Sequence, residues 1–400
     1  MTKDKRNTNE SIANLDNSEE TNKYMIEIQA SSDENAEKVP EVPSEDVTVE
    51  SGKTNRKRNL IYKSLRILFT VGFFLFTVLF LNEIWLQPFL AKKASSKAQN
   101  LYEMPTPTPL IVSDAEPSIS PAGQTSEAET TAPTPTPDPT RDEQGRLLQF
   151  RDLLNINHDV KGWIKIDHLN GENDTKINYV VVQSSNGDPD FYLTRDWEGN
   201  KVKAGSLYLD YKSSVESNTQ NLVIHGHNMT STDDMFHYLL KYNEKDFYDS
   251  HPIIDFNTIF QTGQWKIFSV FITNGSSEKK PFFNFTQSKF RNTSEFLNFV
   301  YQLKIRSILN ADAIEINEND QLLTLSTCSY EVKDYRTVIV ARRVREGEDP
   351  TVDTDKVYLN SEPLYPGSYY YRYGGKAPKF PETFEEALEA GMINWYLPTK

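Results

Sequence analysis

The sequence predicts a mainly β domain over residues 142–345. Short runs rich in β-branched and aromatic residues recur through this segment, and turns rich in Gly, Asn, Asp and Ser separate them. No helices alternate regularly with these runs, and that pattern indicates a β-barrel or a β-sandwich. The runs are WIKI, INYVVVQ, SLYLDY, NLVIHGH, WKIFSVFIT, QLLTLSTC and RTVIVARRV.

Two helices are expected within the same domain. The first is GRLLQFRDLLNI near its start, where Leu and Phe residues form an apolar stripe. The second begins at Ser294, which we expect to cap it, and it precedes the run QLLTLSTC. Its apolar face consists of Phe296, Phe299, Val300 and Leu303.

An apolar segment precedes the domain. Residues 67–86 read ILFTVGFFLFTVLFLNEIWL, about the twenty residues that a helix needs to cross a hydrocarbon core of roughly 30 Å. Trp85 would lie at the membrane interface. A cleavable signal peptide is the alternative, but the long tail before the segment and the length of the apolar run favour an uncleaved signal anchor.

The tail before the anchor, residues 1–66, is predicted to be disordered and cytoplasmic. Most of it is polar and acidic, without a recurring apolar face. Basic residues are more numerous before the anchor than after it, which favours a cytoplasmic N-terminus and an extracellular domain. They are Arg56, Lys57, Arg58, Lys63 and Arg66 before it, and Lys92, Lys93 and Lys97 after it.

Residues 87–141 are predicted to be a wall-spanning linker. From Met104 to Thr140 the chain is rich in Pro, Thr, Ser and Ala, a composition that favours extended polyproline II structure. At about 3.1 Å per residue, such a spacer could hold the domain on the order of 100 Å from the bilayer. That reach suits a substrate within a thick cell wall.

Composition excludes one class of partner and one kind of bond. The formal net charge of -14 argues against a nucleic-acid partner, because phosphate binding needs a clustered basic surface. The only cysteine is Cys328, so the chain cannot form an intramolecular disulfide. The thiol is therefore either an inert buried group or a reactive one.

Three residues next to predicted strands form the strongest candidate for a catalytic site. Cys328 ends LLTLSTC, His227 ends LVIHGH, and Arg336 opens RTVIVARR. Attack on a peptide carbonyl needs a nucleophile, a proton shuttle for the leaving amine and a positive group for the oxyanion, and these residue types supply them. On residue types alone a purely structural role for Cys328 stays open, because a lone cysteine at a strand end is often a small core residue.

The order of several strings resembles class B sortases over residues 142–345. Cys328 lies in Leu325-Ser-Thr-Cys-Ser-Tyr-Glu, and His227 lies in Ile224-His-Gly-His-Asn-Met, with Arg336 following. The other strings are Asn155-Ile-Asn-His-Asp-Val-Lys-Gly-Trp-Ile, Tyr179-Val-Val-Val-Gln, Phe191-Tyr-Leu, Ala204-Gly-Ser-Leu-Tyr-Leu-Asp and Met235-Phe.

The resemblance implies an eight-stranded sortase β-barrel with an N-terminal helix and a helix before the cysteine strand. It also implies a cysteine transpeptidase without a cofactor or metal. Such an enzyme cleaves a sorting signal similar to Asn-Pro-x-Thr-Asn after Thr and passes the acyl group to an amine, usually of peptidoglycan. The expected partners are surface proteins that bear this signal.

Residue by residue, the resemblance makes Cys328 the nucleophile, His227 the general acid and base, and Arg336 the group that binds substrate and steadies the oxyanion. Glu331 falls where class B members often have an acidic residue. Asn228 and Thr327, within the matching strings, are with Glu331 the candidates for accessory roles.

Two departures from the family pattern stand out. His225 occupies a position where the family commonly has Tyr, and residues 346–400 form an aromatic extension beyond the usual end of the domain. We expect this extension to pack on the barrel, because it is too aromatic for a disordered linker. His225 and His227 would face the same side of a regular strand, but no further ligands complete a metal site, so we expect His225 to be structural.

Two other functions stay open on the sequence alone. One is a sortase that polymerises pilin subunits through lysine. The other is a wall-located binding or sensing protein built on a sortase scaffold. The intact set of Cys328, His227 and Arg336 favours an enzyme over the binding protein.

Overall fold

The computed structural model describes residues 51–102, 138–171, 174–217, 219–276, 282–330 and 332–399. The chain forms two compact units, Met1–Phe74 and Leu75–Lys400. Most of the predicted tail, most of the Pro- and Thr-rich linker and the accessory candidate Glu331 lie outside the described residues. Residues 56–101 are helical, and this stretch is long and apolar enough to cross a membrane by its length and composition.

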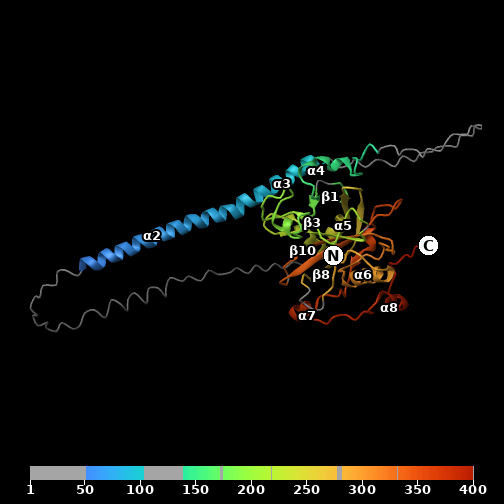
Figure 1. The fold of residues 1–400 in the computed structure, drawn as a ribbon. Helices are drawn as coiled ribbons and strands as arrows, with labels where there is room; N and C mark the ends of the chain where they lie inside the picture. The colour runs from blue at the N-terminus through green and yellow to red at the C-terminus, as the bar shows by residue number, and fades with distance from the viewer. Residues whose placement is uncertain are drawn as a thin grey trace, which may run out of the picture. The chain divides into compact units, whose positions relative to one another are not determined.

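Eight strands close into a barrel in the second unit (Figure 1). Their order around the barrel is β1-β2-β3-β4-β10-β11-β8-β7. Neighbours pair antiparallel except β2 with β3 and β4 with β10, which are parallel. The barrel strands are β1 (Val160–Ile166), β2 (Ile177–Val182), β3 (Leu207–Leu209), β4 (Asn221–His225), β7 (Ile253–Thr258), β8 (Gln264–Asn274), β10 (Leu322–Ser329) and β11 (Tyr335–Arg343).

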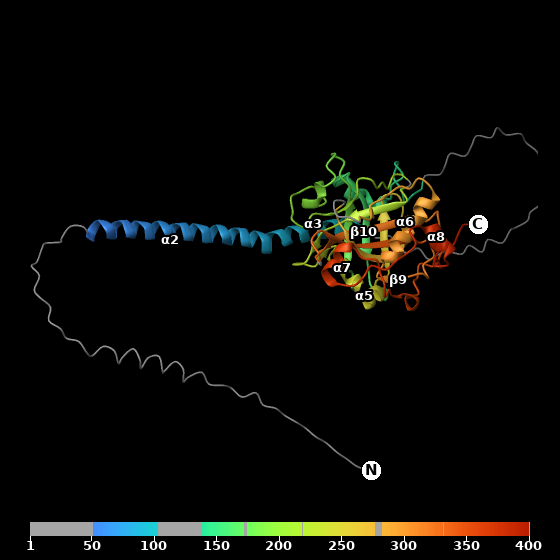
Figure 2. The same cartoon turned by 90° about the horizontal axis from the view of Figure 1, so that it is seen from below.

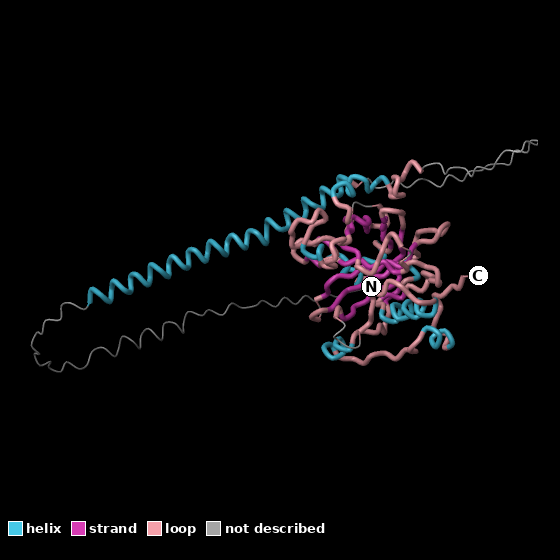
Figure 3. Tube along the Cα trace, in the orientation of Figure 1, coloured by secondary structure: helices cyan, strands magenta, loops and turns pink. Residues whose placement is uncertain are grey.

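This barrel confirms the mainly β prediction and decides between barrel and sandwich. Figure 3 shows the strands gathered in one body, with the helices at its periphery. Small two-stranded pairs add β5 (Asn228–Met229) with β6 (Asp234–Met235), and β9 (Leu309–Asn310) with β12 (Tyr358–Leu359). The helical elements are α2 (Ser51–Leu81), η1 (Asn82–Leu86), α3 (Gln87–Leu101), η2 (Leu148–Phe150), α4 (Arg151–Ile156), η3 (Phe191–Thr194), η4 (His237–Asn243), α5 (Lys245–Ser250), α6 (Thr293–Arg306), η5 (Thr354–Lys356), α7 (Gly367–Tyr373) and α8 (Phe384–Glu389).

The helix α6 covers the outer face of β8 and explains why that strand is buried on both faces. Every residue of β8 after Gln264 is buried, so the strand reads as an almost continuous apolar run. The Oγ of Ser269 donates a hydrogen bond to the carbonyl of Leu303 in α6 at 3.0 Å. The predicted helix before the cysteine strand is therefore present, with its apolar face against the barrel.

The predicted cap of α6 was wrong by two residues. The helix begins at Thr293, and the side chain of Asn292 accepts a hydrogen bond from the backbone N–H of Glu295 at 2.9 Å. Asn is as good an N-cap as Ser, because both accept from the free N–H groups of the first turn. Ser294 instead donates its hydroxyl to Glu385 of the C-terminal segment.

The linker segment starts as a packed helix. Ala91, Ala94 and Ala98 on one face of α3 are buried, and the indole Nε1 of Trp197 donates to the carbonyl of Ala94 at 2.9 Å. Small alanine side chains allow this close approach. Beyond α3, the ring of Tyr102 stacks on Trp163 of β1 with centroids 4.3 Å apart.

The aromatic C-terminal extension packs on the domain, as the sequence predicted. The hydroxyl of Tyr301 in α6 donates to the carbonyl of Pro381 at 2.9 Å, and the Asn298 side chain accepts from the N–H of Phe384 at 3.1 Å. Phe384 and Trp395 are almost fully buried. Figure 2 shows α8 beside α6, in agreement with these bonds.

Candidate active site

The three candidate residues meet at one rim of the barrel because three neighbouring strands end or begin there. Cys328 of β10 lies opposite Arg336 of β11 in the antiparallel ladder. Residues directly opposite in such a ladder have Cβ atoms about 4.5–5.5 Å apart. On the other side, β4 runs parallel to β10 up to the pair His225 and Ser326, so His227 emerges beside the end of the cysteine strand.

Cys328 is the accessible point of an otherwise buried strand. The residues from Leu322 to Thr327 are buried, as is Ser329, whereas Cys328 is half-buried. Its thiol is free. A thiol that solvent and substrate can reach differs from a small core residue, and the exposure therefore favours the reactive reading.

The other two accessory candidates tie the histidine loop to the cysteine strand. The side-chain amide of Asn228 donates to the carbonyl of Cys328 at 3.1 Å, and the hydroxyl of Thr327 donates to the carbonyl of Gly226 at 2.9 Å. Asn228 is held in turn by His237, whose Nδ1 lies 2.8 Å from its Oδ1. These bonds hold the backbone on both sides of His227 against β10.

Glycine is required at position 226 for the same close approach. A Cβ there would lie 2.3 Å from the Cδ2 of Leu207 and 2.7 Å from the Cδ2 of Phe236. Both side chains are fully buried and have no room to move. His227 can therefore lie beside the end of β10 only because the preceding residue, Gly226, has no side chain.

A backbone carbonyl fixes the imidazole of His227. Its Nε2 lies 2.8 Å from the carbonyl oxygen of Leu193, in η3. A carbonyl oxygen only accepts, so Nε2 is the donor in this hydrogen bond. The same loop is held from its other side, because the N–H of Phe236 donates to the carbonyl of His227 at 2.9 Å.

The guanidinium of Arg336 remains available for an anion. It is half-buried, and its one hydrogen bond to a described residue is from Nη1 to the carbonyl of Tyr335 at 3.2 Å. No carboxylate in the described part of the chain forms an ion pair with it. Gly275 adjoins the side chain, because a Cβ there would lie 3.1 Å from the Cγ and Cζ of Arg336.

Tyr208 and Asp210 belong to the same rim, and the sequence analysis did not assign them to it. Burial raises the pKa of the Tyr208 phenol, and the charges of Asp190, Asp210, Arg336 and Cys328 also act on it. The Tyr208 phenol is therefore neutral near pH 7, and it lies close enough to Arg336 and Cys328 to feel their charges. The period of two in SLYLDY, which puts positions 208 and 210 on one side of the strand, was the available signal.

His225 bonds to this second group rather than to His227. Its Nε2 lies 3.1 Å from the Oδ2 of Asp210, and its ring lies 5.4 Å from that of Tyr208. Burial raises the pKa of Asp210, but the hydrogen bonds from His225 and from the N–H of Lys212 hold it below its ordinary value. The two histidines thus use different partners.

Comparison with known proteins decides the family. The Sortase domain family matches residues 173–344. "Sortase B" of Listeria monocytogenes is 33% identical over 187 residues, which are 47% of this chain and 69% of that protein. The chain belongs to the class B sortases. "Sortase B" of Staphylococcus aureus is 30% identical over 199 residues, which are 49% of this chain and 75% of that protein.

Solved sortase B structures are also similar to this one. Sortase B from Bacillus anthracis in complex with AAEK1 is 27% identical, with a TM-score of 0.49 and coverage of 66% of this chain and 100% of that chain. The Staphylococcus aureus sortase B–substrate complex is 29% identical, with a TM-score of 0.42 and coverage of 49% and 86%.

Membership of this family makes the protein a cysteine transpeptidase. Sortases use a cysteine nucleophile, and Cys328 is the only cysteine in the chain. The barrel rim that carries Cys328 is therefore the candidate active site.

Proposed function

We propose that this sortase cleaves a C-terminal sorting signal, similar to Asn-Pro-x-Thr-Asn, after its Thr and joins the acyl fragment to an amine of peptidoglycan. The observation that carries the proposal is the pairing of Cys328 with Arg336 at the rim where His227 is held. The domain over residues 142–345 would anchor surface proteins to the cell wall.

The proposed reaction uses each of the three groups in turn. The Cys328 thiolate attacks the carbonyl carbon of the Thr residue, and the guanidinium of Arg336 stabilises the oxyanion that forms. Protonated His227 then gives its proton to the leaving amine, which leaves a thioester on Cys328.

The thioester is resolved by a second attack. The acceptor amine adds to the thioester carbonyl, His227 removes a proton from that amine, and the thiolate of Cys328 departs. A new amide bond forms, and no oxidant or reductant is needed. Asn228 and Thr327 would hold the histidine loop in place throughout, through their bonds to the Cys328 and Gly226 carbonyls.

The donor is tested with the full-length protein in detergent micelles and a library of sorting peptides. We expect peptides of the Asn-Pro-x-Thr type to add the mass of their fragment up to Thr to the enzyme. Acylation by none of them, or cleavage at another bond, would contradict the proposal. Adding peptidoglycan-type amines or lysine pilin peptides to the acyl-enzyme then separates wall anchoring from pilin polymerisation.

We also propose a single membrane crossing at residues 67–86, with residues 1–66 in the cytoplasm and the extension at 346–400 outside with the catalytic domain. The helical stretch over residues 56–101 supports it, because it is long and apolar enough to span a bilayer. Protease added to intact protoplasts should digest the catalytic domain and spare the tail. A protected fragment that contains residues 142–345 would reverse the orientation.

A further inference from the structure

A pocket opens at the end of the barrel opposite Cys328. Its volume is about 420 Å³, and its lining includes Leu222 at the start of β4, Gln321 just before β10 and Arg343 at the end of β11. Arg343 lies seven residues beyond Arg336 on the same strand. At about 3.4 Å per residue, that is roughly 24 Å from the catalytic rim. A ligand in this pocket would not touch the thiol.

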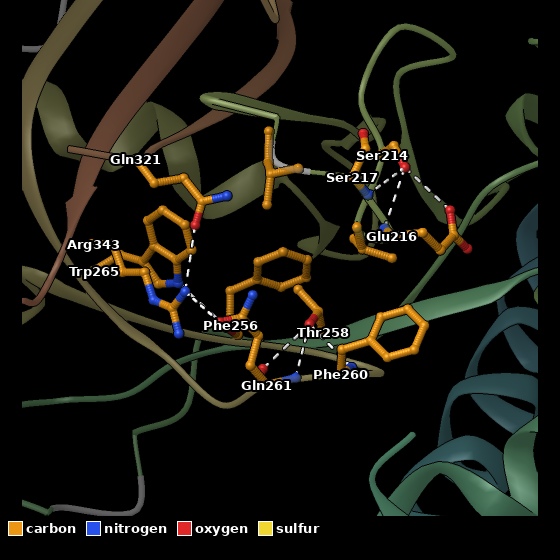
Figure 4. Close-up of a pocket in the computed structure, with 12 residues that line it drawn as sticks. Ser214, Glu216, Ser217, Phe256, Thr258, Phe260, Gln261, Trp265, Gln321 and Arg343 are labelled. Atoms are coloured by element: carbon orange, nitrogen blue, oxygen red, sulfur yellow. Dashed lines mark hydrogen bonds between the residues drawn. The ribbon is translucent and has the colours of Figure 1, made fainter. Parts of the chain in front are cut away.

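The pocket combines an apolar floor with a polar rim (Figure 4). Leu222, Phe256 and Trp265 are almost fully buried and form the floor. The volume falls within the range of roughly 300–1,000 Å³ that small-molecule sites span. The rim carries Ser214, Ser217, Gln261 and Gln321.

Arg343 stands out because the pocket leaves its charge without a counter-charge. Its Nη1 donates to the Oε1 of Gln261 at 2.6 Å and to the Oε1 of Gln321 at 3.5 Å, and its Nη2 donates to the carbonyl of Thr262 at 2.9 Å. All three acceptors are neutral. Burial lowers the pKa of Arg343, and no carboxylate of the described residues forms an ion pair with it. In Figure 4 the guanidinium lies beside Trp265 at the edge of the pocket.

The neighbouring arginines show the contrast. Arg342 donates to Glu348 at 2.5 Å, and Arg345 pairs with Asp320 at 2.7 Å. Each of these two arginines therefore has a carboxylate partner within the protein, although Glu348 also pairs with Lys266.

The acidic residue in the pocket lining does not balance Arg343 either. Glu216 accepts from the Nζ of Lys161 at 2.8 Å and from the hydroxyl of Ser214 at 3.1 Å. Its charge is matched by that lysine. Among the described residues that line the pocket, Arg343 is therefore a cation without a carboxylate partner, and it lies 5.9 Å from the ring of Trp265.

We propose that this pocket binds a small ligand with a carboxylate group. The carboxylate pairs with the positive charge of the Arg343 guanidinium, through the N–H groups that Gln261, Gln321 and Thr262 leave unused. The body of the ligand lies on Trp265 and Phe256. Two sources have this chemistry, namely the free C-terminus of a short peptide and a sugar acid, and both expose an apolar face to aromatic rings.

The first experiment uses the full-length sortase in nanodiscs and two matched pairs of probes in isothermal titration calorimetry. One pair is acetyl-Ala-Ala with a free carboxylate and its C-terminal amide, and the other is methyl glucuronide and methyl glucoside. We expect at least one acid to bind about tenfold or more tightly than its neutral counterpart. The pair that shows the difference identifies the source. Equal or absent binding within both pairs would refute the proposal without any variant.

The second experiment assigns the binding to Arg343. Arg343→Gln should lose about tenfold or more in affinity for the acid and keep its affinity for the neutral probe. Arg345→Gln removes the same charge from a pair outside the pocket and should bind like the wild type. Unchanged binding by Arg343→Gln, or an equal loss of affinity in both variants, would show that Arg343 does not bind the carboxylate of the ligand. Methanethiosulfonate labelling of Cys328 should be equal in all three proteins.

Discussion

Cys328→Ala is expected to abolish acyl-enzyme formation completely. The variant removes the only sulfur nucleophile of the chain, at the accessible point of a buried strand. His227→Ala is expected to lower kcat by roughly 10²–10⁴-fold, the usual contribution of a positioned general acid and base. Intact-mass spectrometry of the full-length proteins after incubation with a cleavable sorting peptide measures the first effect, and the rate of amide formation measures the second.

Matched controls separate these effects from loss of fold. His158→Ala replaces an exposed histidine in the turn before β1 and should react at the wild-type rate. Methanethiosulfonate should label Cys328 in the folded wild type and leave no adduct on Cys328→Ala. Continued transpeptidation by Cys328→Ala, in a protein with an unchanged melting curve, would assign the chemistry to another group and revive the binding-protein hypothesis.

Seven of the eight barrel strands match runs predicted from the sequence, because their β-branched and aromatic residues reflect burial in a sheet; β7 was not among the predicted runs. The run over β8 is apolar at nearly every position, and the structure shows why, since α6 covers one face and the barrel interior the other. The closure of the barrel was not predictable from periodicity, because it depends on the parallel pairings of β2 with β3 and of β4 with β10. Only the family resemblance supplied the strand number.

The cap of α6 and the packing of α3 show the same limit. Asn292 and Ser294 are both good N-cap residues. In the structure Asn292 caps the helix, while Ser294 bonds to Glu385, which lies about ninety residues later in the chain. The alanines of α3 are too small to give a clear apolar pattern in the sequence. Their buried face becomes evident only in the structure, where the indole of Trp197 packs on it. Contacts between distant segments decide both cases.

Within the candidate site, the sequence pointed to residues through their chemical types and strand positions, and it missed those whose place at the rim depends on neighbours. A single cysteine and an arginine on the next strand draw attention without a structure. Tyr208 and Asp210 do not, because tyrosine and aspartate are common at strand ends. The sequence suggested a structural role for His225, and only the structure shows that it bonds to Asp210 beside Tyr208. The lack of a carboxylate partner for Arg343 was likewise hidden, since the sequence shows three similar arginines, Arg342 and Arg343 at the end of β11 and Arg345 just beyond it.

Arg336→Lys is expected to lose on the order of 100-fold or more in kcat/KM although it keeps the positive charge. The proposed role of Arg336 requires several N–H donors in a planar fork aimed at a developing oxyanion, and lysine offers a compact point charge with a different reach. The surroundings support this view. The guanidinium has no carboxylate partner in the described part of the chain, and it lies opposite the nucleophile in the ladder. Apart from the bond of Nη1 to the Tyr335 carbonyl, no described residue accepts from its N–H groups.

The measurement compares kcat/KM for a sorting peptide in folded wild type, Arg336→Lys and Arg151→Lys. Arg151 is largely exposed on α4, so its replacement tests the same chemical change where no oxyanion forms, and it should leave the rate unchanged. The loss in Arg336→Lys should appear mainly in kcat, because an interaction that strengthens only as the oxyanion develops contributes little to ground-state binding. If the loss fell entirely on KM, Arg336 would bind the substrate without stabilising the oxyanion. A wild-type rate would remove it from the proposed mechanism.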